Sequence, residues 1–186
     1  KIYHLLWLFL LAHSNVFSQN ESFSSRIVTS SYQLNSAWEL TYGPDDSLWV
    51  TENSSYLVSK INILNGGKTQ LIDLSSMHDA FSTWPQGGLM GMALHPSMYN
   101  EWPAPSKPWV YLAYVYKKVG DFKTKNGNDS GSFFKTRIVR YVYDRPNHKL
   151  KSPQTIIESL NGSSDHNSGR LAIGKVNGVD YLFYTI

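Results

Sequence analysis

Short runs of alternating apolar residues return along the chain in sets of four, and this repeat restricts the folds that the sequence can adopt. The first set comprises residues 38–43, 48–51, 57–63 and 69–74. The second comprises residues 89–94, 109–116, 137–143 and 154–160, and a third begins with 170–174 and 181–186. Alternation with a period of two, bounded by turn residues, predicts β-strands. The sequence therefore predicts an all-β chain with about two and a half copies of a four-stranded unit.

Four strands in each repeat, and repeats of roughly 50 to 80 residues, are typical of a β-propeller built from four-stranded antiparallel blades. The residue that ends the first strand of each repeat falls at Gly43, His95 and Gly174. The second interval is longer because residues 117–131 are polar and rich in Gly, Asn and Lys, so we expect them to form a loop inserted between two strands. A β-sandwich is the alternative, but it gives no reason for self-similarity at this period.

Composition agrees with a folded β-rich domain and argues against some partners. Hydrophobic residues make up 41% of the chain and aromatic residues 14%, which excludes wholesale disorder and favours strands. The net charge of +3 arises from scattered Lys and Arg, so no nucleic-acid partner is expected. The chain contains no Cys, and its stability must come from core packing or bound ions instead of disulfides.

The first 18 residues predict a secretory signal peptide. Lys1 precedes an apolar stretch at residues 5–12, and Val16 and Ser18 form a small-residue cleavage pattern. The apolar stretch is too short for a membrane anchor, which needs about 20 residues. A buried N-terminal strand is the other alternative. We expect cleavage before Gln19, a mature domain spanning residues 19–186 with no membrane span, and a secreted or periplasmic location.

Two loops, each leading into the first strand of a repeat, contain the residues best suited to catalysis or ligand binding. One contains Gln86 and the other contains Asp165 and His166. Gln86 precedes His95 by the same nine positions that separate Asp165 from Gly174. Because equivalent positions in neighbouring propeller blades face one channel mouth, we expect these side chains to converge on one cavity.

Three segments resemble the soluble quinoprotein glucose and sorbosone dehydrogenases. They are QGGLMGMALHP at 86–96, DHNSGRL at 165–171, and WEL at 38–40 followed by 45–52. The resemblance covers residues 34–186. It implies a six-bladed propeller that uses pyrroloquinoline quinone (PQQ) and calcium to oxidise aldose sugars to lactones, passing electrons to an external acceptor. It also implies that these residues are the N-terminal part of such a propeller and are inactive alone.

The resemblance assigns roles to three of these residues. His166 matches the catalytic base, which removes the proton of the anomeric hydroxyl while hydride passes to the quinone. Imidazole, with a pKa of about 6.5, suits that role around neutral pH. Gln86 and Asp165 match sugar-contacting positions, and a carboxylate beside an imidazole also raises its basicity. The residues that bind PQQ and calcium are expected beyond Ile186, so no metal ligand is assigned in this chain.

Other polar residues have simpler structural explanations. Arg170 is expected to tie its loop to a strand, and His95 to mark a strand end. Gly87, Gly88 and Gly91 lack the spacing and Lys of a phosphate-binding loop, so close strand packing explains them.

Two further pairs of polar residues also fit turns. Asp45 and Asp46 lack the spaced ligands of a calcium loop and fit a tight turn. His78 and Asp79 fit a solvated turn.

The sequence leaves two further functions open. A non-catalytic propeller ectodomain that binds carbohydrate or protein is one, although such relatives tend to be stapled by disulfides. A calcium-dependent propeller lactonase is the other, with Glu52 and Asn53 as its one hint in this sequence.

Overall fold

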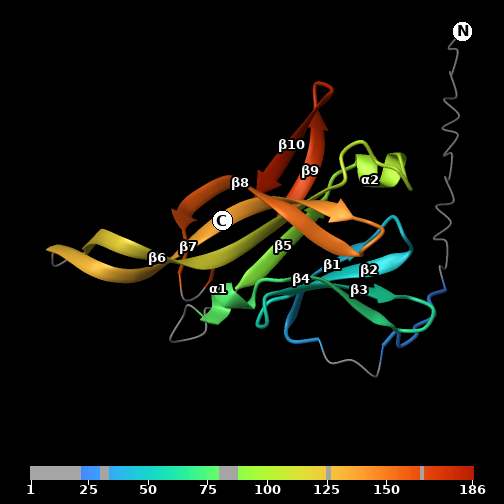
Figure 1. Cartoon of the computed structure of the whole chain (residues 1–186), viewed down its shortest axis with the longest axis horizontal. Helices are drawn as coiled ribbons and strands as arrows, with labels where there is room; N and C mark the ends of the chain where they lie inside the picture. Colours follow the sequence, from blue (N-terminus) through green and yellow to red (C-terminus); the bar gives the residue numbers. More distant parts are fainter. Residues whose placement is uncertain (1–21, 30–33, 80–87, 125–126, 164–165) are drawn as a thin grey trace, which may run out of the picture.

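The computed structural model describes residues 22–29, 34–79, 88–124, 127–163 and 166–186. Within them the chain forms two four-stranded antiparallel sheets and a two-stranded hairpin (Figure 1). The expected signal peptide at residues 1–18 lies outside the described residues.

The first sheet follows the chain in the order β1-β2-β3-β4. Its strands are β1 (Ala37–Tyr42), β2 (Ser47–Glu52), β3 (Leu57–Asn62) and β4 (Lys68–Asp73). The turn between β1 and β2 is built as the sequence predicts, since Asp45 accepts a hydrogen bond from the Trp49 indole at 3.0 Å and pairs with Lys60 at 2.8 Å. Burial would raise the pKa of Asp45, but the hydrogen bonds from Lys60 and Trp49 outweigh it and lower that pKa. Asp45 therefore serves the turn.

The second sheet has the order β5-β6-β7-β8. Its strands are β5 (Leu89–Leu94), β6 (Trp109–Thr124), β7 (Gly127–Asp144) and β8 (Lys149–Asn161). Two short helices precede and follow β5: α1 (Ser75–Asp79) and α2 (Ser97–Asn100). The turn expected at His78 and Asp79 is therefore wrong, because these residues belong to α1.

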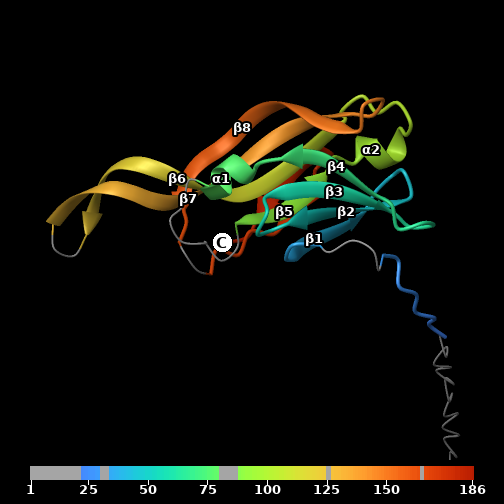
Figure 2. The ribbon, with the colours of Figure 1, turned by 60° about the horizontal axis from the view of Figure 1, so that its bottom comes forward.

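The insertion at residues 117–131 is not a loop. β6 and β7 remain paired through it, from Lys117 opposite Phe134 to Thr124 opposite Gly127. The paired strands form an arm that projects beyond the other strands of the sheet (Figure 2). The polar composition of these residues gave no strand signal. An arm outside the core needs no apolar face, because backbone hydrogen bonds keep its two strands paired.

The third unit is the hairpin of β9 (Leu171–Val176) and β10 (Val179–Tyr184). Asn177 and Gly178 form its turn with φ of 48° and 81°. Two central residues at positive φ suit a tight hairpin with the twist of its strands. The turn predicted at these residues is confirmed.

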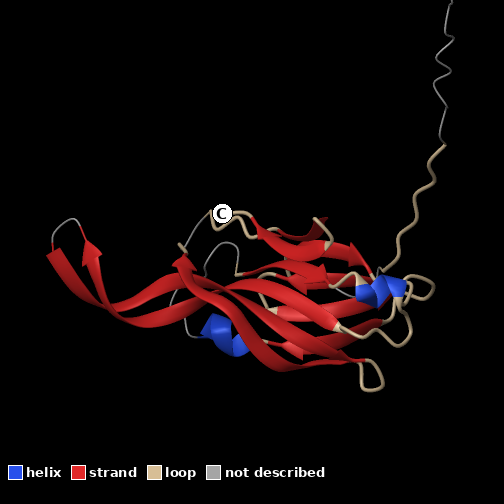
Figure 3. Ribbon diagram, turned by 90° about the horizontal axis from the view of Figure 1, so that it is seen from above, coloured by secondary structure: helices blue, strands red, loops and turns tan. Residues whose placement is uncertain are grey.

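The three units stack in chain order, with β1 against β5 and β5 against β9. Strands make up most of the described chain, and the two short helices lie at its edges (Figure 3). The core between the first two sheets includes Trp49, Leu71, Leu112 and Tyr141. A smaller cluster between the second sheet and the hairpin holds Ala93, Ala113, Ile138 and Leu171.

Every residue of β5 is buried, because neighbours cover both faces of its sheet. A β-sandwich covers one face of each sheet. The arrangement is that of successive propeller blades, two complete and one begun, as the repeat predicted.

Candidate functional site at the entry to the first strands

The starts of β1, β5 and β9 lie at one end of the stacked sheets, which we call the mouth end. Asn53 joins the first two, since its N–H donates to Ser36 O at 2.9 Å and its side-chain amide donates to Leu89 O at 3.3 Å. Gly91 in β5 lies directly against the backbone of Gly169 and Leu171. The starts of neighbouring first strands thus lie close together, and the convergence of Gln86, Asp165 and His166 on one cavity stays a prediction.

Two of the three predicted site residues, Gln86 and Asp165, lie outside the described residues. His166 is described and exposed, at the mouth end just before β9. The structure brings Trp38 and Ser168 to the same place.

The backbone at His166 adopts an unusual conformation. Its φ is 52°, that of Ser168 is 57° and that of Gly169 is 100°. Left-handed values at non-glycine residues cost free energy and persist where the surroundings enforce them, in turns such as Asn177 as well as at functional sites.

Hydrogen bonds of the residues around His166 hold the backbone of this loop in place. Asn167 is buried, and its side chain accepts the Ser163 N–H at 2.7 Å and donates to Ser163 O at 2.8 Å. Thr185, after β10, accepts the Gly169 N–H at 3.1 Å and donates its own N–H to Arg170 O at 3.1 Å. The loop is thus closed on itself and fixed to the hairpin, with His166 between these anchors.

A hollow of about 480 Å³ opens beside His166. Its described lining is Trp38, His166, Asn167, Ser168 and Ile186. This volume falls in the usual range for small-molecule sites. The lining combines one large aromatic face with an imidazole and a hydroxyl, which suits a compact polar ligand that has an apolar side.

Arg170 connects this loop to the first blade. Its guanidinium lies 3.7 Å from the carboxylate of Glu39 in β1. Burial raises the pKa of Glu39, and the charge of Arg170 partly offsets that rise. The expectation that Arg170 ties the loop to a strand is confirmed, and that strand lies two blades away.

Gly88 and Gly91 are explained by close packing, as expected. A Cβ on Gly88 would lie 2.5 Å from the Tyr56 ring and 2.9 Å from Asn53 O. A Cβ on Gly91 would collide with the backbone oxygen of Gly169. Gly87 lies outside the described residues.

Glu52 and Asn53 hold the first blade together. The buried carboxylate of Glu52 pairs with Lys68 at 2.6 Å and accepts hydrogen bonds from Ser59 and from the Asn35 N–H. Its oxygens are engaged by the protein, so it is unsuited to a metal at the mouth. Among the described residues, no three His, Asp or Glu side chains lie close enough together to hold a metal ion.

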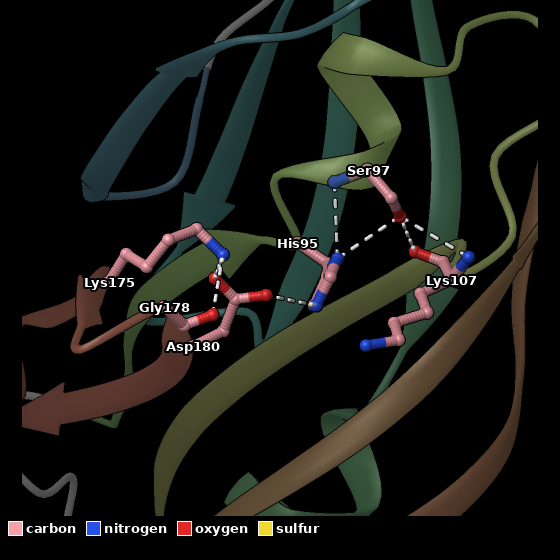
Figure 4. Close-up of polar contacts among 6 residues, drawn as sticks. All are labelled: His95, Ser97, Lys107, Lys175, Gly178 and Asp180. Carbon is pink, nitrogen blue, oxygen red and sulfur yellow. Dashed lines mark hydrogen bonds and ion pairs between the residues drawn. The ribbon is translucent and has the colours of Figure 1, made fainter.

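His95 lies at the opposite end of β5, which we call the far end, in a second polar cluster (Figure 4). The Ser97 N–H donates to His95 Nδ1 at 3.1 Å, which leaves the proton of the neutral ring on Nε2, facing Asp180 at 3.6 Å. Asp180 also accepts a hydrogen bond from Lys175 at 2.7 Å. Burial, assisted by the charge of Lys107, lowers the pKa of His95.

The far-end cluster superficially resembles an Asp-His-Ser triad, but it cannot activate Ser97. The Ser97 hydroxyl donates to Lys107 O at 2.7 Å, and the lone pair of His95 Nδ1 is already engaged by the Ser97 N–H. A base must have that lone pair available. His95 is therefore a structural residue that ends β5, as the sequence indicated.

The family model described as Glucose / Sorbosone dehydrogenase matches residues 34–186. The chain belongs to this family. The matched range coincides with the one over which the three motifs carried the resemblance.

Two relatives illustrate the similarity. Quinoprotein glucose dehydrogenase B of Acinetobacter calcoaceticus is 29% identical over 170 residues, which are 91% of this chain and 31% of that protein. The solved PQQ-bound form of aldose sugar dehydrogenase from Streptomyces coelicolor is 27% identical with a TM-score of 0.55, covering 76% of this chain and 36% of that one. The chain thus spans about a third of the length of these relatives. Within its described residues, no helix is both long and apolar enough to cross a membrane.

Proposed function

We propose that the protein containing this chain is an exported PQQ-dependent aldose dehydrogenase in which His166 is the general base. One observation carries the proposal: an exposed His held at positive φ beside an open hollow, at the end where the first strands of three successive blades begin. The family supports a dehydrogenase, and the PQQ-bound relative supports the cofactor.

His166 would act on the anomeric hydroxyl of the sugar. Its imidazole accepts the hydroxyl proton, the O–H electron pair becomes the second bond of the new carbonyl, and the hydrogen on C1 leaves as hydride. PQQ, when bound, supplies the acceptor for that hydride. The product of the sugar is a lactone, and an external acceptor then takes up the electrons. General-base assistance of this kind typically contributes about 10²- to 10⁴-fold.

The described residues fit the substrate side of such a site. Around the hollow they offer the His166 imidazole and the Ser168 hydroxyl, which suit sugar hydroxyls. The described lining contains no Lys or Arg to pair with the carboxylates of PQQ, and no carboxylate for calcium. We therefore assign no cofactor or metal ligand in this chain; Gln86 and Asp165 are proposed as further sugar contacts.

Reconstitution with PQQ and calcium, followed by D-glucose-dependent reduction of a dye, tests the proposal in the full-length protein. His166→Ala should lower kcat by about 100-fold or more. His148 provides a matched control, because it is also exposed and also at positive φ, 51°, but lies in the β7–β8 turn at the far end. His148→Ala should leave kcat within twofold.

Different results reject different parts of the proposal. Turnover of His166→Ala within a few-fold of wild type would show that another group is the base. A reconstituted wild type that oxidises none of a panel of aldoses would reject the dehydrogenase itself, and sugar binding without turnover would favour a binding propeller.

Export rests on the N-terminal pattern of a charged residue, an apolar stretch and a small-residue cleavage pattern. Sequencing the N-terminus of the mature protein tests it. We expect the mature chain to begin at Gln19, and retention of residues 1–18 would reject the signal peptide.

A further inference from the structure

Trp38 is the one large aromatic side chain in the described lining of the hollow beside His166. It belongs to β1, in the first blade, and 49% of its surface is exposed. Leu40 and Tyr42 follow at alternate positions of the same strand and are exposed by 61% and 54%. Alternate positions of a regular strand share one face, but the pairing register of β1 with β2 shifts between Ala37 and Leu40, at Trp38. Of these three, Trp38 alone lines the hollow.

The structure fixes the start of β1 relative to the loop of His166. Ser36 accepts the N–H of Asn53 at 2.9 Å, which holds the start of β1 to the end of β2. Arg170, which lies four positions after His166, is 3.7 Å from Glu39. The Glu39 N–H donates to Thr51 Oγ1, whose hydroxyl in turn donates to Met90 O in β5. Trp38 and His166 are therefore held on one framework that spans all three blades.

The lining of the hollow combines two kinds of chemistry. An indole ring presents a broad apolar face, and that face complements the C–H side of a pyranose ring. His166 and Ser168 supply polar groups for the hydroxyl rim. Asn167 contributes less, because both ends of its side-chain amide are bonded to Ser163. An apolar wall in the same hollow as a base would set the orientation of a ring whose anomeric hydroxyl must reach that base.

We propose that Trp38 is the stacking wall for the aldose ring and positions its anomeric hydroxyl toward His166. This inference rests on the proposed function. It assigns Trp38 to ground-state binding of the substrate, so its removal should act on KM more than on kcat.

Steady-state kinetics of the reconstituted full-length protein with D-glucose test the assignment. Trp38→Leu keeps an apolar side chain for packing but removes the flat ring, and Trp38→Phe keeps a flat ring. The Leu variant should raise KM about tenfold, which corresponds to about 1.4 kcal/mol, with kcat within threefold. The Phe variant should remain within threefold of wild type in both. Leu40→Ala, at an exposed position of the same strand outside the hollow, should leave KM unchanged.

The unfolding midpoint of each variant and the PQQ concentration for half-maximal reconstitution complete the experiment. An unchanged KM in folded Trp38→Leu overturns the inference, as does an equal KM change in Leu40→Ala. A raised PQQ requirement with unchanged KM overturns it too, because Trp38 would then contact the cofactor. The proposed function fails separately, if wild type itself oxidises no aldose.

Discussion

The two ends of the stacked sheets each hold a histidine next to the first strand of a blade, and the surroundings of the two histidines differ. At the mouth end His166 is exposed, its backbone is held at positive φ, and a hollow lies beside it. At the far end His95 is buried, and both ring nitrogens face protein groups. The contrast teaches that burial and an adjoining hollow, and not the type of side chain, distinguish a candidate site residue from a structural one.

The largest effect should come from pushing the mouth-end loop away from β5. Gly91→Ala places a Cβ on the backbone oxygen of Gly169, which no side-chain rotation can relieve. We expect a loss of about 3 kcal/mol in the free energy of unfolding, measured by chemical denaturation. Gly174→Ala is the control, since its Cβ would approach only the mobile end of the Phe183 ring, at 3.2 Å. Equal losses in the two variants would contradict the tight packing of loop on strand.

Replacing each of the two histidines by Ala in turn tests the comparison. His95→Ala removes a buried, hydrogen-bonded ring and should lower the free energy of unfolding by about 2 kcal/mol, leaving kcat within twofold. His166→Ala should do the reverse, with a large loss of kcat and an unfolding free energy within about 0.5 kcal/mol of wild type. A large loss of activity in His95→Ala, measured on folded protein, would break the contrast.

The far end should also respond to pH in a defined direction. Because the pKa of His95 is lowered by folding, the unfolded chain binds the proton more readily. Its contribution to stability is therefore present above the unfolded pKa of about 6.5 and is lost as pH falls below it. The charged groups that act on the ring are Lys107, Asp180, Glu101 and Lys175, and Asp180 lies 3.6 Å from Nε2.

Unfolding free energies measured between about pH 7 and pH 5 follow this group. His95→Gln should flatten the decline relative to wild type, whereas His148→Gln should retain it. An unchanged slope in His95→Gln would show that His95 is as easily protonated in the folded protein as in the unfolded chain.

The smallest effect is expected at Arg170. Its side chain is 73% exposed and lies 3.7 Å from Glu39, so solvent screens the attraction. Arg170→Gln should cost about 0.5 kcal/mol of unfolding free energy, and less at high salt. A double-mutant cycle with Glu39→Gln measures the coupling; a coupling of zero at low salt would show that other contacts hold the loop to β1.

Much of the architecture was predictable because local sequence patterns determine its strands and turns. Alternating runs and turn residues located every strand of the two sheets and the hairpin, and the Asn177-Gly178 turn follows from conformational preference alone. The arm formed by β6 and β7 was missed, since its polar sequence carries no period-two signal. The two short helices on either side of β5 were missed as well, because they span only one turn or so.

The sequence alone determined the repeat, the order of the blades and the family, and it placed His166 on a loop that enters a first strand. Tertiary structure decided which side chains meet. The pairs Glu52–Lys68, Arg170–Glu39 and His95–Asp180 form between strands or blades. Local spacing in the sequence does not predict them. Trp38 reaches the hollow of His166 for the same reason: stacking of successive blades brings together residues far apart in the chain, and only the packed arrangement fixes their distances and burial.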